Sequence, residues 1–399
     1  MAKGSPQTLR LAVLSGAIGI SALGDTLALI ALSFAVKEMS GSGLQVAAIF
    51  IAVWSPAAFL AAPAGLLADR REPRKVLALI SLLQVPVAVA LAFVGSSIPM
   101  ILLALVLGIG FALGQPSEFA LIPAVAGESG VRRANGWIET ARYTGFTLGP
   151  VVGGVLTAAG GTKLALLIDA CTFVAVAGAA LWLPNAHSEH EPRPDTGRAR
   201  DGIVYLFRDR TLGLVMVVAL SSLLMMTASA TAEVFFATDY LHTGSGGYGL
   251  LITGWTLGMA TGAAVFAPRL RGALPVIALV AIVIQSVGLG LPTLWLAFGF
   301  TLVCWIIGGL AHGTKNVVLR TLIHERVPAH LHGRAYAGYN GARNAAELVA
   351  MISGGLIVTA FGARTTLFLA GAIPALFGLA GLAWYASTQR GAEPAAEQT

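Results

Sequence analysis

Twelve long apolar segments constrain this chain more than any other feature. Each has at least the roughly 20 residues that an α-helix needs to cross a bilayer. A segment in lipid must satisfy its own backbone hydrogen bonds, so each one predicts a helix. The expected spans are about 10–36, 44–68, 75–95, 99–123, 132–159, 163–184, 211–240, 246–268, 273–292, 294–318, 333–360 and 365–387. The pattern predicts an all-α integral membrane protein with twelve transmembrane helices.

Composition supports this fold class and excludes an ordinary soluble protein. Hydrophobic residues make up 56% of the chain and charged residues only 11%, against about 25% charged residues in soluble domains. Cys171 and Cys304 fall in apolar runs, show no metal-ligand spacing and give no indication of a disulfide. No cleavable signal peptide is expected, because the first apolar run continues to about Val36.

The placement of basic residues predicts the topology. Of the 25 Lys and Arg residues, only Lys37, Lys163 and Arg364 fall at helix ends assigned to the outside. Three more fall within spans, and the remaining nineteen fall at the opposite ends. Basic residues favour the cytoplasmic side, so both termini are expected in the cytoplasm of a multi-pass cell-membrane protein. The net charge of +6 is thereby explained as a topology signal, and a nucleic-acid partner is not expected.

The two halves of the chain repeat with a shift of 201 residues. The shift aligns Arg133-Ala134 with Arg334-Ala335, Arg142 with Arg343, Gly153-Gly154 with Gly354-Gly355, and Leu121-Ile122 with Leu322-Ile323. Duplicated six-helix units are typical of transporters that rock around a central site. The expected domains are an N-terminal six-helix bundle (1–184), a cytoplasmic linker (185–210), and a C-terminal six-helix bundle with a short cytoplasmic tail (211–399).

A glycine run lies in the fifth predicted span. Gly145, Gly149 and Gly153 are four residues apart, so they share one helix face on which another helix can pack closely. Pro150 removes a backbone hydrogen bond and predicts a bend. The repeat places Ala350-Met351 where the first half has Gly149-Pro150, so only the first half carries this element. The run, with Gly154, predicts a moving contact between helices.

In the glycine run and in one loop, the chain resembles the major facilitator superfamily. The glycine run fits the helix-5 antiporter motif of the drug/proton antiporter branches, and the loop after the second span resembles the family's loop motif at Gly65, Asp69, Arg70 and Arg74. The resemblance implies that the glycine face packs on helix 8 and controls opening, and it favours export. In this loop Glu72 and Pro73 replace the usual glycine and basic residue.

In this loop, the Asp69 carboxylate lies among arginines at helix ends. Such a group can form a cytoplasmic latch, an ion pair that breaks when the two halves rotate. The alternative is that the loop is only a cluster of basic residues on the cytoplasmic side. Leu102 to Pro116 contains no basic residue, although many drug antiporters carry an arginine in this helix. This absence, with Gly24-Asp25 in the first span, resembles the branch of macrolide-efflux and siderophore exporters.

Charged residues inside predicted spans are the candidate site. Such groups are costly in a bilayer and usually face the protein interior. Asp25, near the middle of the first span, and Glu118 are the first candidates for proton or substrate contact, with a structural pair as the alternative. The other candidates are Glu139, Arg142, Glu233, Arg343 and Glu347. Glu118, Glu139 and Arg142 are expected to form either a titrating network or a static salt bridge. Asp169 is expected to be structural, and Lys315 to extend to the membrane surface.

These patterns and the family resemblance predict a secondary transporter that moves a lipophilic or amphipathic small molecule by alternating access, with protons as the coupling ion. The resemblance implies that the direction is export. The alternatives are a lipid or lysolipid translocator or an importer of the same fold, or a receptor or scaffold that transports nothing. No enzyme activity, cofactor or metal is expected, because no catalytic, nucleotide-binding or metal-ligand motif is present. The expected partners are the substrate, protons and the lipid bilayer, and a monomer is expected.

Overall fold

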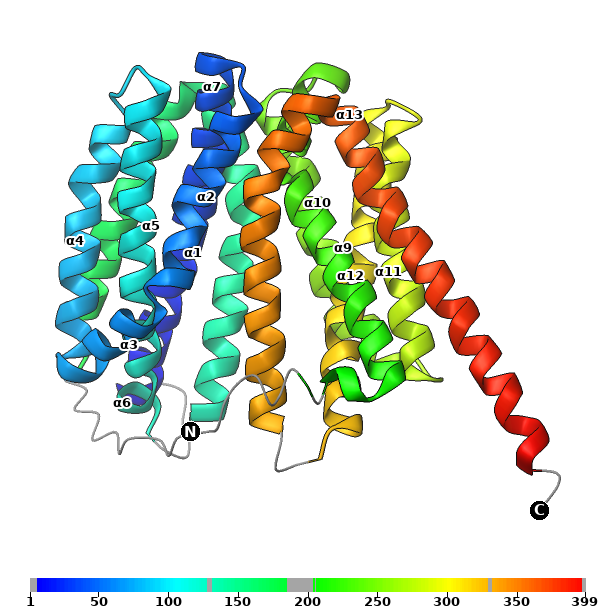
Figure 1. The fold of residues 1–399 in the computed structure, drawn as a ribbon. Coiled ribbons are helices and arrows are strands. Elements are labelled where there is room, and N and C mark those ends of the chain that lie inside the picture. The colour runs from blue at the N-terminus through cyan, green and yellow to red at the C-terminus, as the bar shows by residue number, and fades with distance from the viewer. Residues whose placement is uncertain (1–5, 128–130, 185–203, 205, 329–331, 397–399) are drawn as a thin grey trace. The chain divides into compact units, whose positions relative to one another are not determined.

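The computed structural model describes residues 6–127, 131–184, 204, 206–328 and 332–396, and every regular element in this part of the chain is helical (Figure 1). The first half contains α1 (Pro6–Ser40), α2 (Gly43–Phe59), α3 (Ala61–Arg70), α4 (Pro73–Leu91), α5 (Ser97–Ala120), α6 (Ile122–Ala126) and α7 (Val131–Trp182). The second half contains α9 (Arg210–Phe235), η2 (Phe236–Tyr240), α10 (Ser245–Thr261), η3 (Gly262–Phe266), η4 (Ala267–Arg269), α11 (Leu274–Gly290), η5 (Leu291–Thr293), α12 (Phe298–Arg326) and α13 (His332–Ala396).

Gly161 and Gly362 each divide a long helix into two. The backbone has φ 71° and ψ 175° at Gly161, and φ 76° and ψ 161° at Gly362. Almost only glycine adopts this region. The two glycines are 201 residues apart, as are Gly41 (φ 62°) and His242 (φ 51°), which follow the first helix of each half. The backbone therefore carries the predicted duplication.

The described helices account for the twelve predicted spans. Nine helical stretches are long and apolar enough to cross a membrane, and the 17-residue helix α2 is a shorter apolar one. Two of the nine, α7 and α13, each contain two spans joined at the glycine bend. The predicted twelve-helix membrane fold is confirmed. The expected span 44–68 is interrupted at Leu60, because Pro63 has no N–H to donate one turn back.

The described chain forms two compact units. The first comprises α1 to α7 together with Thr243–Thr253, which includes the start of α10. The second comprises α9, η2 and the chain from Gly254 onward. In the first unit α1 packs along α7, and in the second α9 packs along α13. Each unit has its own apolar core. The domain boundaries expected from sequence stay a prediction, and most of the expected linker lies outside the described residues.

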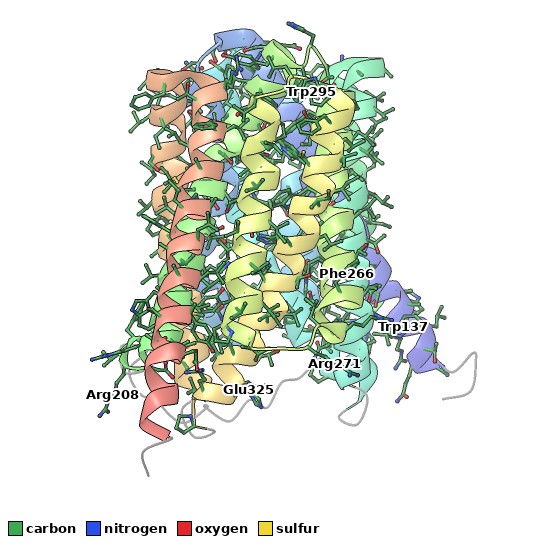
Figure 2. All side chains as sticks on the ribbon, turned by 90° about the vertical axis from the view of Figure 1, so that its right-hand side faces the viewer. Trp137, Arg208, Phe266, Arg271, Trp295 and Glu325 are labelled. Carbon is green, nitrogen blue, oxygen red and sulfur yellow. The ribbon has the colours of Figure 1, made fainter. Side chains whose placement is uncertain are left out.

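The helices of the second unit have chemically different ends. Figure 2 shows Arg208, Arg271 and Glu325 at one end and Trp295 at the other. Tryptophan is enriched at membrane interfaces, and basic residues gather on the cytoplasmic side. Which side of the membrane each end faces stays a prediction.

Candidate functional site

A buried ion pair joins α5 to α7. Arg142 Nη2 lies 3.1 Å from Glu118 Oε2, and both side chains are nearly excluded from solvent. Arg142 Nε lies 3.8 Å from Glu139 Oε1, whose side chain is 44% exposed. The guanidinium also lies over the Phe119 ring, 5.3 Å from its centroid. The structure therefore brings together the three charges that the sequence grouped, with Glu118 as the buried partner.

Asp25 of α1 lines two small cavities. The first cavity is mainly apolar and is lined by Asp25, Asp169 and the aromatic pair of Trp54 and Phe111. These two rings are 5.6 Å apart, edge to face. The second cavity shares Asp25 and Phe111 with the first.

Polar groups line the second cavity, which adds Ser21, Gln84 and Glu118 to the residues around Asp25. Each of the two cavities has a volume of about 20 Å³, enough for one water molecule. The Asp25 carboxylate interacts electrostatically with Asp169, Glu118 and Arg142. Three carboxylates from α1, α5 and α7 thus lie in the region formed by the two cavities that share Asp25.

Asp169 is the member of this region that sequence reasoning assigned to structure alone. Its side chain is buried, and Oδ1 accepts a hydrogen bond from Thr172 Oγ1 at 3.3 Å. Oδ2 has no hydrogen-bond partner among the described residues. A Cβ atom at Gly24 would come within 2.5 Å of Asp169 Oδ1, so glycine beside Asp25 admits the second carboxylate. The proximity of Asp169 to Asp25 depends on which faces of α1 and α7 pack together, and the sequence does not give this.

The charged candidates of the second unit have different surroundings. Arg343 Nε and Glu347 Oε1 form an ion pair at 2.9 Å, with side chains 45% and 27% exposed. Glu233 is buried and accepts a hydrogen bond from Ser229 Oγ at 3.2 Å. The expectation that Lys315 extends to the surface is wrong: its side chain is buried, and Nζ donates to Gln285 Oε1 at 2.9 Å.

The glycine face of α7 packs on α1. A Cβ atom at Gly153 would lie 2.8 Å from Leu27 Cα, and one at Gly149 would lie 2.8 Å from Leu23 O. A Cβ atom at Gly145 would lie 2.8 Å from the backbone nitrogen of Leu23. Backbone atoms cannot move aside as a side-chain tip can, so these positions require glycine. The resemblance assigned this face to helix 8, and the structure assigns it to the first helix.

A neighbouring face of α7 meets the start of α10, within the first unit. Ser245 Oγ donates to Gly154 O at 3.0 Å, and Thr253 Oγ1 donates to Thr147 O at 3.0 Å. A Cβ atom at Gly249 would lie 2.9 Å from the carbonyl carbon of Pro150. The contact expected with helix 8 is therefore made through Pro150 and Gly154.

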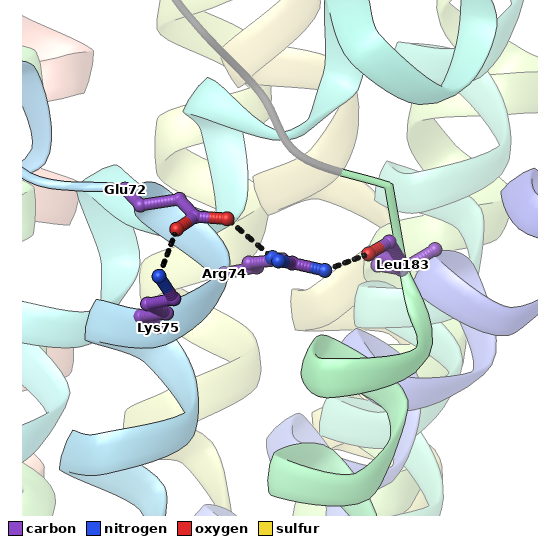
Figure 3. A network of polar contacts seen from close by, with 4 residues as sticks. All are labelled: Glu72, Arg74, Lys75 and Leu183. Carbon is purple, nitrogen blue, oxygen red and sulfur yellow. Dashed lines mark hydrogen bonds and ion pairs between the residues drawn. The ribbon is translucent and has the colours of Figure 1, made fainter.

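The loop before α4 forms a local cluster (Figure 3). Glu72 pairs with Arg74 Nε and, at 2.6 Å, with Lys75 Nζ. Arg74 Nη1 also donates to Leu183 O at 3.2 Å, which ties this loop to the end of α7. Lys75 and Arg74 hold the pKa of the Glu72 carboxyl below its ordinary value. The residue that departs from the family pattern is thus the anion that binds Arg74.

The structure gives fewer contacts for the other residues expected in the latch. Arg70, at the end of α3, is exposed. Gly65 and Asp69 fall within the same helix, but their burial and side-chain contacts lie outside what the structure describes.

Comparisons with known proteins agree with this architecture. A sequence model described as Major Facilitator Superfamily matches residues 14–267 and 214–399. The multidrug efflux pump Tap of Mycobacterium tuberculosis is 26% identical over 379 residues, which cover 89% of this chain and 88% of Tap.

Two solved structures show the same fold. The nucleoside transporter NupG has a TM-score of 0.70 at 16% identity, covering 96% of this chain and 99% of NupG. A bacterial homolog of the human lysosomal transporter Spinster has a TM-score of 0.72 at 14% identity, covering 96% and 97%.

Proposed function

This chain belongs to the Major Facilitator Superfamily and is a membrane transporter of small molecules, and from that premise we propose that it exports a lipophilic or amphipathic compound in exchange for protons. Transport proceeds by alternating access between two six-helix bundles of one monomer in the cell membrane. Both termini lie in the cytoplasm. The observation that carries the proposal is the position of Asp25 between two cavities that also hold Asp169 and Glu118.

The three carboxylates support proton coupling. An ionised carboxylate in a bilayer is costly unless it is paired or wetted. Glu118 has such a partner in Arg142 at 3.1 Å, whereas the structure gives Asp25 no ion pair among the described residues. A proton on Asp25 or Asp169 relieves the repulsion between them, and the cavity volume admits the water that a proton needs for entry. In this proposal Asp25 carries the proton, and Glu118, Glu139 and Arg142 tune its release.

The substrate class is supported by the lining of the cavity beside Asp25. Trp54 and Phe111 present aromatic faces next to Asp25 and Asp169, in a cavity otherwise lined by apolar side chains. Apolar walls with a few polar groups are typical of sites for lipophilic ligands. At about 20 Å³ the cavity holds one water molecule, so in this proposal it widens during the transport cycle to admit the substrate. Export is favoured by the relative named as a multidrug efflux pump. Glu233, Arg343 and Glu347 are candidates for further substrate or proton contact.

The α7 contacts support a gate. Gly145, Gly149 and Gly153 hold α7 against α1, while Pro150 and Gly154 contact the start of α10. Few side chains separate these backbones, so the helices can slide with small changes in packing. In the proposal the α10 contact opens and closes, and the α1 contact keeps the first unit intact.

The loop motif supplies the latch. In this proposal the latch consists of Gly65, Asp69, Arg70 and Arg74. Glu72 forms an ion pair with Arg74 and so fixes the position of its guanidinium group (Figure 3).

Transport in vesicles tests the proposal. We expect wild-type protein in phosphatidylcholine vesicles to move one or more dyes from a panel of lipophilic dyes of positive, negative and zero charge when a pH gradient is imposed. Asp25→Asn is expected to abolish the gradient dependence, and Glu118→Gln to reduce it at least tenfold. Dye fluorescence and an internal pH indicator measure both fluxes.

Glu38→Gln is the matched control, because Glu38 lies on the same helix as Asp25 and is exposed near its end. This variant is expected to behave like the wild type. Dye transport by the wild type that is equal with and without the gradient contradicts proton coupling. Normal coupling in both cavity variants contradicts the assignment of Asp25 and Glu118.

A further inference from the structure

The second unit contains a cavity larger than the two beside Asp25. It lies among α9, α12 and α13 and has a volume of about 80 Å³, room for several water molecules or a small headgroup. The side chains from α9 are apolar, among them Met226. α12 contributes His312 and Lys315, and α13 contributes Arg343 and Glu347.

Lys315 is fixed at the wall of this cavity. Its Nζ donates to Gln285 Oε1 at 2.9 Å and lies 3.3 Å from His312 Nδ1. Gln285 is held in turn, because its Nε2 donates to Ser222 Oγ at 3.2 Å. An ammonium group has three N–H donors. Gln285 accepts from one, and His312 accepts from a second when its Nδ1 carries no proton. One donor is left for a group in the cavity.

The charges around the cavity do not balance. Arg343 and Glu347 pair at 2.9 Å, which leaves Lys315 as the further positive charge. Its two hydrogen-bond partners, a glutamine and a histidine, carry no negative charge, and no described carboxylate lies within ion-pair distance of it. A buried ammonium without a counter-ion is costly. One negative charge in the cavity would remove this cost.

The duplication shows that this charge is specific to the second half. A shift of 201 residues takes five lining residues of the polar cavity in the first unit onto lining residues of this one. Ser21 and Gln84 become Ser222 and Gln285, which lie behind Lys315. The Trp54 and Phe111 pair becomes Trp255 and His312, whose rings are 5.9 Å apart.

The sign of the charge at the cavity changes under the same shift. Asp25 and Glu118 become Met226 and Leu319, and Gly114 becomes Lys315. The equivalent cavities therefore have the same frame and opposite charge: two carboxylates in the first unit and an unpaired ammonium in the second.

We propose that the Lys315 cavity binds a single anionic group, a carboxylate or a phosphate ester, carried by an otherwise apolar substrate. Lys315 supplies the charge, His312 and Gln285 fix its position, and the apolar side chains of α9 contact the rest of the molecule. This proposal rests on the proposed transport function and narrows its substrates to anionic amphiphiles.

Binding to the full-length protein in phosphatidylcholine nanodiscs tests the site. The probes are octanoate, octyl phosphate, octyltrimethylammonium and inorganic phosphate. Trp255, beside His312, is the local fluorescence reporter, and a Trp255→Phe variant identifies its signal. We expect octanoate or octyl phosphate to bind the wild type, and Lys315→Met to weaken that binding at least tenfold. Lys163→Met, an equal change at a lysine that stacks on Phe93 of the first unit, is expected to have no effect.

A second variant keeps the test decisive if Lys315→Met folds poorly. Leu319→Glu introduces the carboxylate that Glu118 supplies in the first unit, so it is expected to pair with Lys315 and abolish anion binding. Equal binding by the wild type and these variants overturns the proposal. Tighter binding of octyltrimethylammonium than of octanoate does the same. Inorganic phosphate that binds as well as octyl phosphate also overturns it, since the apolar part then contributes nothing.

The binding readout separates this proposal from the proposed function. Lys315-dependent octanoate binding without any proton-driven flux leaves the cavity assignment intact and contradicts export. Proton-driven dye transport that is unchanged by Lys315→Met leaves export intact and contradicts the anionic substrate.

Discussion

Arg142 and Arg343 occupy equivalent positions in the two halves, yet their surroundings differ. The side chain of Arg142 is 10% exposed and pairs with Glu118 of α5, another helix. The side chain of Arg343 is 45% exposed and pairs with Glu347, four residues along its own helix. Breaking a buried pair leaves an uncompensated charge, whereas exposed pairs contribute little.

We therefore expect Arg142→Met to lower the free energy of unfolding by about 3–5 kcal/mol and Arg343→Met by about 0–1 kcal/mol. Unfolding in mixed detergent micelles measures both changes, and Arg343→Met is the matched control. The double variant Glu118→Gln with Arg142→Met is expected to recover most of the loss. Equal losses at the two arginines would show that burial does not decide the effect.

Asp209 gives a prediction outside the membrane-spanning segments. Its Oδ1 accepts hydrogen bonds from the N–H groups of Thr211 and Leu212 at 2.9 and 3.0 Å, which caps α9. Its Oδ2 pairs with Arg326 Nη1 of α12 at 2.8 Å. Partial burial alone would raise the pKa of the Asp209 carboxyl, but these hydrogen bonds outweigh burial and hold the pKa below its ordinary value.

The depressed pKa of Asp209 fixes the sign of a pH effect. The stability that this carboxylate contributes is complete above its unfolded pKa of about 3.9 and is lost as pH falls through the lower folded value. We expect Asp209→Asn to unfold at a lower temperature than the wild type at pH 7. The gap should narrow as the pH falls below about 4. Thermal unfolding in detergent across this pH range measures it, and a gap that does not change with pH contradicts the assignment.

At the scale of elements, α1 packs along α7 and α9 packs along α13, and each pair meets at equivalent glycines. Gly153 meets Leu27, and its equivalent Gly354 meets Ala228, which is the residue equivalent to Leu27. The same backbone approach therefore holds the first and fifth helices of each half together. Only the first half adds Pro150, which contacts Gly249 at the start of α10.

Gly153→Ala is expected to destabilise the protein by about 1–3 kcal/mol, because the added Cβ meets backbone atoms of Leu27. Gly136→Ala on the same helix is the control, since a Cβ there meets nothing within 4 Å. That control should be neutral or stabilising, because alanine favours helix by about 0.5–1 kcal/mol over glycine. Unfolding in mixed micelles compares the two variants, and similar effects at both positions would contradict close packing as the reason for Gly153.

At the scale of the whole molecule, basic residues predict the topology. Cysteine labelling tests it on α4, whose two ends carry exposed residues, Arg71 before the helix and Ser96 after it. Cys171→Ser and Cys304→Ala provide the background. We expect Ser96→Cys to react with an impermeant maleimide in intact cells, and Arg71→Cys to react only after permeabilisation. The reverse pattern would contradict the proposed orientation.

The sequence by itself determined the twelve helices, the duplication and which charges stand within apolar spans. Apolar length, charge asymmetry and the spacing of 201 residues are local or periodic properties, so they can be read without coordinates. The pairing of Glu118 with Arg142 was also among the predicted alternatives, because both residues stand in apolar spans where a charge needs a partner.

Only the tertiary structure decided which faces of the helices meet. In a membrane, lipid and protein interior are both apolar, so apolar periodicity does not mark the buried face of a helix. For this reason the sequence did not place Asp169 beside Asp25, or Lys315 against Gln285, or the three glycines of α7 on α1. Each of these contacts depends on the rotation and register of two packed helices, and the candidate site consists of such contacts.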